Sequence, residues 1–471
     1  MRVFPLLLPA CAGVALTLAS CGPRLAPRLQ AGAGAKAPAT SDAGNNVASP
    51  MESLAEAVFP SSKTGWGALA PADKPKLAAF SKDYLAFLSI ARTQRAAAKA
   101  LVALAVGAGA IPFDGSGKHK PGSLLYWQDR AGSSLALLKV GELPIREGLR
   151  IIVATTDGGV IRLTPAPTYE KSGLALFDTT ILGELELESW LNTPLILDVH
   201  VADPTGGEGK TVTIGDDADE PVFTIPDLLP HLSRKVQRRG LIDSPERLDA
   251  LAAFSLKALN KGLSSYGLSA GDWNRAEAQL LPAGSASYIG VDRALIAAPN
   301  HQARAFPYAA TKALLENSVQ HTSLVILMGH NESSYAGGKG EAHIRNLLPM
   351  AIAQQEGDLD ALALRRIYAR SKVLLFGNHS GKRNHGIVLN SRKDDASPKA
   401  FRDALQSLES TKTQYQVLES SGWSDAREVA SLDMDAVEVG LPIAGVGTPN
   451  TLISTLDLYQ ALLACQGWIS Q

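Results

Sequence analysis

The chain has 471 residues, with 45 Lys and Arg against 46 Asp and Glu, so its formal net charge is -1. At ~150 residues per domain, this length corresponds to roughly two or three domains. The neutral balance argues against a nucleic-acid-binding protein, which carries a basic excess or stripe, and against an acidic disordered chain. Hydrophobic residues make up 45% of the chain, so the composition indicates a globular protein with a full core.

The first twenty residues have the pattern of an export signal. Arg2 supplies a positive charge, and an apolar run from residue 3 to about 19 follows it, interrupted by Pro5 and Pro9. This run is too short and too interrupted for a membrane span of ~20 apolar residues. We therefore predict a signal peptide at residues 1–20.

The signal ends in a segment that resembles a bacterial lipobox. Residues 18–21 read Leu-Ala-Ser-Cys, and Gly22 rather than Asp follows Cys21. In a lipobox the Cys thiol receives a diacylglyceryl group, so the segment predicts an exported lipoprotein, with the outer membrane facing the periplasm as its location. The alternative is an ordinary signal peptide with a chance Cys. In the lipoprotein reading, the lipid at Cys21 is the chain's contact with the membrane.

The next segment, residues 21–50, is rich in Ala, Gly, Pro, Ser and Asn, which predicts a flexible tether. Apolar positions at helical spacing then predict one long helix over residues 76–106, ended by Gly107 and Gly109. Strands are predicted at 123–127, 134–138 and 150–156, and the last of these is apolar enough to be buried on both faces.

The middle and end of the chain complete the pattern. Residues 166–244 alternate apolar and polar positions and predict a β-rich insertion. Helices are predicted at 248–259, 309–315 and 451–464, and buried strands at 324–328 and 372–376. The alternation predicts an α/β domain, formed by residues 51–165 and 245–471, with a mostly parallel sheet flanked by helices.

The cysteines exclude a disulfide framework within one chain. Of Cys11, Cys21 and Cys465, the first leaves with the signal and the second would be acylated. Cys465 then stands alone, so no disulfide and no thiolate metal cluster can form. Its apolar neighbours at 462–464 predict a small buried hydrophobe.

Polar residues follow three of the predicted strands, at 154–157, 329–332 and 377–379. Open α/β sheets place their sites at such strand ends. Together with the segments 225–232, 290–302 and 437–448, these stretches resemble the aspartyl aminopeptidase family of dinuclear zinc exopeptidases. The resemblance extends over about residues 80–465 and includes a Trp landmark at Trp190.

The resemblance implies a zinc-exopeptidase fold whose insertion serves in homo-oligomerisation. In the family, a His of that insertion enters the active site of a neighbouring subunit, and His231 matches it. Asp157 falls on the family residue that orients a metal-binding His. Because Thr155 stands in place of that His, Asp157 is better explained as a turn or helix-cap residue.

Most of the family's zinc ligands are replaced in this sequence. Zinc in such a site is bound by imidazole and carboxylate groups, and a carboxylate base takes a proton from the metal-bound water. Glu332 keeps its ligand position, whereas Asn331 replaces the base and cannot accept a proton at neutral pH. The other four ligand positions hold Thr155, Gln302, Phe376 and Gly447.

The sequence therefore favours a catalytically inactive homologue that binds peptides or proteins, or acts in assembly, without a cofactor. The alternative is an active zinc aminopeptidase that removes N-terminal acidic residues and uses a rebuilt metal site. Its candidate ligands are Glu332, His330, His379 and His343. Against this, the same side chains can be hydrogen-bonded polar residues, and a purely structural oligomeric scaffold remains a third interpretation.

A glycine-rich segment at 206–211 ends in Gly-Lys-Thr, as phosphate-binding loops do. A phosphate-binding loop lies between a strand and a helix. Here residues 212–214 read as a strand and the upstream spacing differs, so nucleotide binding is not expected.

Overall fold

The computed structural model separates the chain into two units, Met1–Ser49 and Pro50–Gln471. It describes residues 64–115, 117–129, 132–183, 185–227, 248–329, 339–357, 360–378, 381–391, 397–419 and 434–471, with the backbone alone for 339–346 and 378. All of these belong to the second unit. The predicted signal peptide, tether and Cys21 lie outside the described residues.

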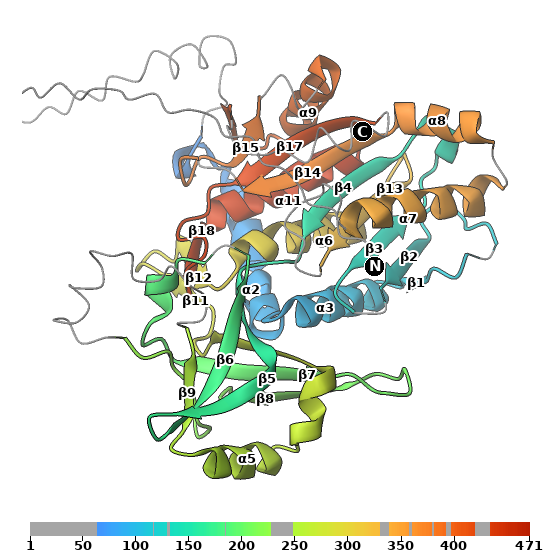
Figure 1. Ribbon diagram of the computed structural model, residues 1–471. Helices are drawn as coiled ribbons and strands as arrows, with labels where there is room; N and C mark the ends of the chain where they lie inside the picture. The colour runs from blue at the N-terminus through green and yellow to red at the C-terminus, as the bar shows by residue number, and fades with distance from the viewer. Residues whose placement is uncertain are drawn as a thin grey trace, which may run out of the picture. The chain divides into compact units, whose positions relative to one another are not determined.

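A nine-stranded mixed sheet forms the centre of the α/β domain (Figure 1). In spatial order its strands are β1 (Ile111–Pro112), β2 (Leu124–Gln128), β3 (Leu135–Lys139), β13 (Ser323–Met328), β4 (Arg150–Thr155), β14 (Lys372–Asn378), β17 (Asp435–Leu441), β15 (Ile387–Asn390) and β16 (Tyr415–Leu418). The four central strands, β13, β4, β14 and β17, are parallel. The predicted α/β fold class is confirmed.

Strand β4 shows why this sheet needs helices on both faces. Ile152 and Ala154 point into one apolar core, whereas Ile151 and Val153 point into another, because successive side chains of a strand alternate between faces. Full burial of one such aliphatic side chain contributes about 1.5–3 kcal/mol. A strand with apolar residues at every position is therefore stable only between two layers.

The helices supply these two layers. The first core receives side chains from α2 (Lys74–Ile90), α3 (Gln94–Gly107), α6 (Ala305–Glu316), α9 (Pro398–Ser410) and α11 (Thr455–Ile469). The second core receives them from α7 (Lys339–Glu356) and α8 (Ala361–Arg370). Short 3₁₀ helices connect these elements at η1 (Trp66–Ala68), η2 (Pro71–Asp73), η3 (Ile145–Glu147), η4 (Leu187–Trp190), η6 (Ala270–Arg275) and η7 (His301–Ala303).

The helix predicted over residues 76–106 is in fact two helices, α2 and α3. The helices separate at residues 91–93, where Thr93 adopts an extended backbone and its Oγ1 accepts a hydrogen bond from Ala96 N at 3.0 Å. A Thr in this conformation is a good N-cap. The prediction was wrong here because apolar spacing continues across the break and hides the cap.

A second, six-stranded antiparallel sheet forms the β-rich insertion. In spatial order its strands are β8 (Lys210–Ile214), β7 (Leu195–Val201), β10 (Ala276–Pro282), β5 (Val160–Lys171), β6 (Leu174–Leu182) and β9 (Ala250–Ala253). Helix α5 (Leu256–Ser265) contributes Leu259 and Leu263 to its core. The strands of this sheet lie within residues 160–282, whereas the sequence-based boundaries of the insertion are 166–244.

Two predicted helices begin later than expected because a short strand precedes each of them. Ala250–Ala253 pair with β6, and α5 starts only after the N-cap Ser255. In the same way, Thr451–Ser454 form β18, which pairs with β12 (Leu295–Ala298), and Ser454 caps α11. With β11 (Ser287–Ile289) these strands make a third, three-stranded sheet.

Cys465 lies on α11 and is fully buried, as the sequence predicts. Burial raises the pKa of its thiol well above the usual value, so the side chain acts as a small hydrophobe. In the part of the chain that the structure describes, no helix combines the length and hydropathy that a bilayer span requires.

Candidate functional site

The parallel strands β4, β13, β14 and β17 end at one edge of the large sheet, which we call the carboxyl edge. Thr155 at the end of β4 is level with Met328 at the end of β13, and Asn378 at the end of β14 is level with Leu441. The described parts of the three predicted polar stretches thus lie at a common edge, as expected of an open α/β sheet.

The hydroxyl groups of Thr155 and Thr156, at the end of β4, both donate hydrogen bonds to the neighbouring strand β13. Thr155 Oγ1 donates to Met328 O at 3.2 Å and accepts from Asp157 N at 2.9 Å. Thr156 Oγ1 donates to Ser133 O and to Met328 O at 3.2 and 3.1 Å. Thr155, which is predicted to replace the family's first His ligand, therefore closes a tight turn through its hydroxyl group.

Asp157 is buried and lies near a buried arginine that the sequence did not single out. The Arg304 side chain is 3% exposed, and it donates to Ala91 O at 2.6 Å, Thr156 O at 2.7 Å and Ala303 O at 2.9 Å. Burial lowers the pKa of Arg304 to about 10, while the charges of Tyr84 and Asp157 oppose this shift. Asp157 thus offsets the charge of a structural arginine, besides forming the predicted turn.

The 3₁₀ helix η7 contains Gln302, the residue that is predicted to replace an Asp that binds both zinc ions in the family. Gln302 is 6% exposed, and its Nε2 donates to Asn300 Oδ1 at 3.1 Å. Its Oε1 is buried without a hydrogen-bond partner in the described part of the chain. Asn300 packs against Gly158 so closely that a Cβ there would overlap its Oδ1, which explains a glycine at that position.

An aromatic pair near the end of β14 includes Phe376, the residue that is predicted to replace the family's Asp ligand. Phe376 stacks on Phe306 of α6, with ring centroids 4.4 Å apart and planes inclined by 13°. Phe306 is fully buried. Offset stacking of this kind contributes about 0.5–1.5 kcal/mol beyond the area buried. This part of the edge is therefore built as hydrophobic core.

Gly447, which is predicted to replace the family's final His ligand, contacts the insertion through its backbone. Gly447 has φ +85°, a conformation in which an L side chain is strained. Its carbonyl oxygen accepts from Trp190 Nε1 at 2.8 Å and from Glu186 N at 3.0 Å. Trp190, the predicted landmark, is buried at this contact.

The remaining candidate residues cannot be placed. His231, His330, Asn331, Glu332 and His379 lie outside the described residues, and His343 lies on α7 with its side chain outside the description. Within the described ranges, no three His, Cys, Asp or Glu side chains come together as a metal site would require.

The four described residues that the resemblance matches to ligand positions do not supply the donors that two zinc ions need. The side chains of Phe376 and Gly447 offer no donor atom, and Thr155 and Gln302 are neutral where the family uses imidazole and carboxylate.

A buried histidine beside Gln302 uses both of its ring nitrogens in hydrogen bonds within the protein. His301 pairs through Nδ1 with Tyr84 Oη at 2.9 Å and through Nε2 with Ile296 O at 3.0 Å. Burial lowers its pKa to about 3, so the ring is neutral. Neither this pair nor Arg304 was singled out from the sequence. The one sequence feature that could have indicated the role of Arg304 is its place as a single charged residue directly before the apolar segment 305–310.

Comparison with known proteins agrees with this fold. The family model described as aminopeptidase I zinc metalloprotease (M18) matches residues 87–355. A probable M18 family aminopeptidase 1 of Borrelia garinii is 25% identical over 454 residues, covering 86% of this chain and 99% of that protein.

Solved structures show the same architecture. The M18 family aminopeptidase of Thermotoga maritima superposes with a TM-score of 0.79 at 23% identity, covering 87% of this chain and 99% of that one. The mApe1 dodecamer of S. cerevisiae gives a TM-score of 0.67 at 13% identity, covering 82% and 95%. The matched family model spans more than half of the chain, and this chain therefore belongs to the M18 family of zinc metallo-aminopeptidases.

Proposed function

We propose that this chain is a catalytically inactive homologue of the M18 aminopeptidases that acts through peptide or protein binding or through assembly. The stacked pair of Phe376 and Phe306 carries the proposal. The partly buried ring of Phe376 packs against the core. No rotation of this side chain can supply a metal ligand, because the ring has no donor atom and the core packing holds it in place.

The other described positions support the same conclusion. Thr155 is engaged in a turn, and Gly447 has a backbone conformation that favours glycine. In addition, the sequence has Asn331 where the family is expected to have its general base, and an amide does not take a proton from water at neutral pH. Thr155, Gly447 and Phe376 would each remove a metal ligand, and Asn331 would remove the base, so two requirements of hydrolysis are lost together.

Peptides are the ligands we expect, because the family consists of aminopeptidases. Oε1 of Gln302 is a buried acceptor without a partner in the described residues. An unsatisfied buried acceptor costs about 1–3 kcal/mol, and an N–H donor of a bound ligand would remove that cost. This makes Gln302 the described residue that we propose to contact the ligand.

The proposal is tested on the purified chain lacking residues 1–50 by measuring bound zinc and the release of N-terminal Asp or Glu from peptides. We expect zinc well below one ion per chain and no release. Zinc near two ions per chain together with release would refute inactivity and favour a rebuilt site at Glu332, His330, His343 and His379. In that case Glu332→Ala should abolish zinc uptake.

We also propose that the chain is exported, lipid-anchored through Cys21 and homo-oligomeric through its insertion. The lipobox-like segment at 18–21 supports the anchor, and the dodecameric state named for the yeast structure supports an oligomer. Light scattering on the chain lacking residues 1–50 tests the oligomer, and a mass of one chain would refute it.

A further inference from the structure

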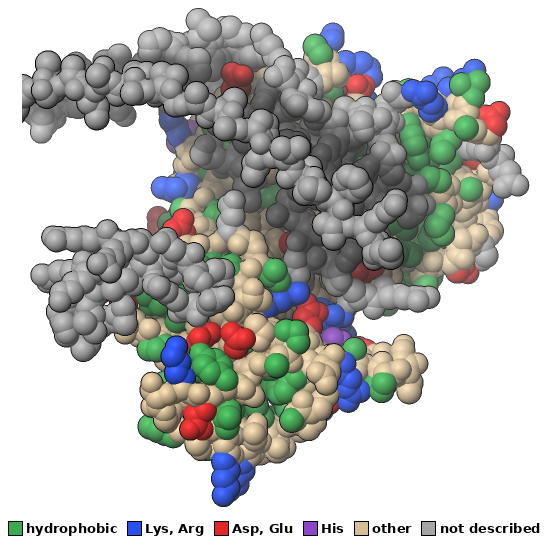
Figure 2. Space-filling view, in the orientation of Figure 1, with side chains coloured by type: hydrophobic (Ala, Val, Ile, Leu, Met, Phe, Trp, Pro, Cys, Tyr) green, Lys and Arg blue, Asp and Glu red, His purple; other side chains and the backbone are tan. Residues whose placement is uncertain are grey.

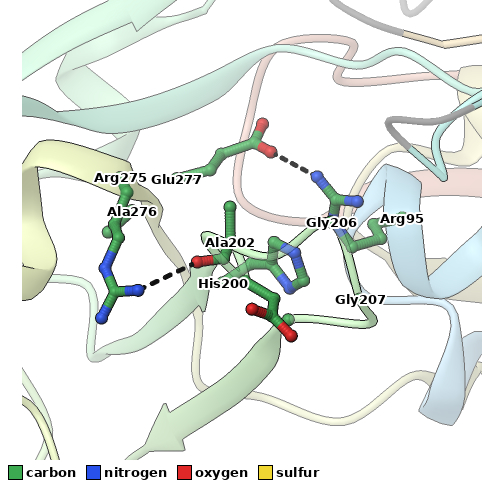
Figure 3. Close-up of a pocket in the computed structure, with 10 residues that line it drawn as sticks. Arg95, His200, Ala202, Gly206, Gly207, Arg275, Ala276 and Glu277 are labelled. Atoms are coloured by element: carbon green, nitrogen blue, oxygen red, sulfur yellow. Dashed lines mark hydrogen bonds and ion pairs between the residues drawn. The ribbon is translucent and has the colours of Figure 1, made fainter.

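A cavity of about 750 Å³ lies between α3 and the insertion sheet. Its walls include Arg95 of α3, His200 at the end of β7, and Arg275 and Glu277 around the start of β10. In Figure 3 Arg95 and Arg275 flank His200. Figure 2 shows Lys and Arg, Asp and Glu, and His side chains gathered near the β7–β8 loop on the visible face. The cavity uses none of the residues at the carboxyl edge.

The charges of this cavity are balanced. Glu277 pairs with Arg95 at 2.9 Å and with Arg162 at 2.5 Å. Arg275 Nη2 donates to Asp272 Oδ1 at 2.9 Å and its Nη1 donates to Ala202 O at 3.5 Å. A guanidinium group carries five N–H donors, so Arg275 retains donors for a carboxylate ligand.

Asp203 supplies an anionic wall next to Arg275. Its Oδ1 accepts from Thr205 N and from Thr205 Oγ1, both at 2.8 Å. These hydrogen bonds lower the pKa of Asp203, and the charge of Arg275 adds to the effect. Its Oδ2 faces Gly207, where an added Cβ would lie 2.5 Å from that oxygen. The carboxylate is therefore ionised at neutral pH and oriented by the loop.

The glycine-rich segment that resembles a phosphate loop has a different use here. At Gly209, a Cβ would overlap Val201 O and lie 3.0 Å from the His200 ring. Glycine thus lets the loop between β7 and β8 approach both His200 and Asp203. Burial and the charge of Arg95 lower the pKa of His200, and its Nδ1 pairs with Thr211 Oγ1 at 3.1 Å.

We propose that this cavity binds a zwitterionic short peptide, with its carboxylate on Arg275 and its ammonium group on Asp203. The balanced walls do not favour a simple anion or a simple cation, whereas a zwitterion complements both signs. The volume lies within the range of about 300–1,000 Å³ that is usual for small-ligand sites. This inference does not rest on the proposed function, since it concerns a different part of the chain.

The test is calorimetric titration of the full chain with L-alanyl-L-alanine, its N-acetyl form and its C-terminal amide. We expect saturable binding of the free dipeptide and at least ~10-fold weaker binding of both capped forms, because each lacks one charge. Asp203→Asn should weaken the free dipeptide at least ~10-fold, and Arg275→Gln should do the same.

A control variant and a carboxyl-edge variant separate this site from the ligand contact proposed at Gln302. Asp219→Asn changes an exposed carboxylate outside the cavity, so it should bind the dipeptide as the unmodified chain does. Equal binding of capped and free dipeptides, wild-type affinity in Asp203→Asn, or no saturable heat would each overturn the proposal. Lost binding in Gln302→Leu with retained binding in Asp203→Asn would instead place the dipeptide at the carboxyl edge.

Discussion

Replacing Phe376 by Asp places a carboxylate where the resemblance predicts the family's Asp ligand, and we expect this change to destabilise the chain without creating a zinc site. Truncation of a buried Phe costs about 3–5 kcal/mol, and Phe376 is partly buried, so the lower part of this range applies. The lost stacking on Phe306 accounts for about 0.5–1.5 kcal/mol of it. A carboxylate placed against Phe306 would also be desolvated without a partner.

The matched control is Phe376→Leu, which keeps an apolar side chain and should cost about 1 kcal/mol. We expect Phe376→Asp to be at least about 2 kcal/mol less stable than this control in urea unfolding, and neither variant to gain bound zinc. A difference of 2 kcal/mol corresponds to about 30-fold in the folding equilibrium. Equal stability of the two variants, or new stoichiometric zinc in the Asp variant, would show that the position is not part of the core.

Three further predictions concern other residues. Arg304→Met should lower the free energy of unfolding by about 3 kcal/mol or more. Three carbonyl groups lose the hydrogen bonds that the guanidinium group donates, and each is worth about 1 kcal/mol. A urea midpoint equal to that of the wild type would contradict this. Since the pKa of His301 is about 3 in the folded chain and about 6.5 when unfolded, stability should fall as pH drops below about 6.5, by up to about 1.4 kcal/mol per pH unit. In His301→Gln this part of the pH dependence should disappear, and an unchanged pH profile of the urea midpoint would contradict the assignment. Cys21→Ala should abolish incorporation of labelled palmitate in cells, and labelling that persists would exclude Cys21 as the lipid site.

The central strands could be predicted from sequence because their signal is local. The central residues of β4, β13 and β14 are continuous apolar runs, and the predicted bounds of these strands agree with the structure to within two residues. The short strands β9 and β18 could not be predicted in this way. Each directly precedes a helix, so its residues continue the apolar pattern of that helix, and only pairing with distant strands reveals them.

In the candidate site, too, some features have a local sequence signal and others depend on contacts between distant residues. The four candidate ligand positions were predicted from the order of the motifs, whereas the contacts that their side chains and backbones make extend across the fold. Phe376 meets Phe306 from 70 residues away, and the Gly447 carbonyl meets Trp190 at a separation of 257. Arg304 bonds to carbonyls near residues 91 and 156. No local pattern predicts such partners, because the sheet topology brings them together.

These contacts would oppose the introduction of single metal ligands at the carboxyl edge. A His at position 447 would have to adopt φ +85°, which costs about 1–2 kcal/mol for a residue with a Cβ. Strain relieved by a backbone shift would in turn disturb the carbonyl group that holds Trp190 and Glu186. Gly447 is thus coupled to the packing of the insertion, so a metal ligand introduced at this position would disturb both the local backbone and that contact.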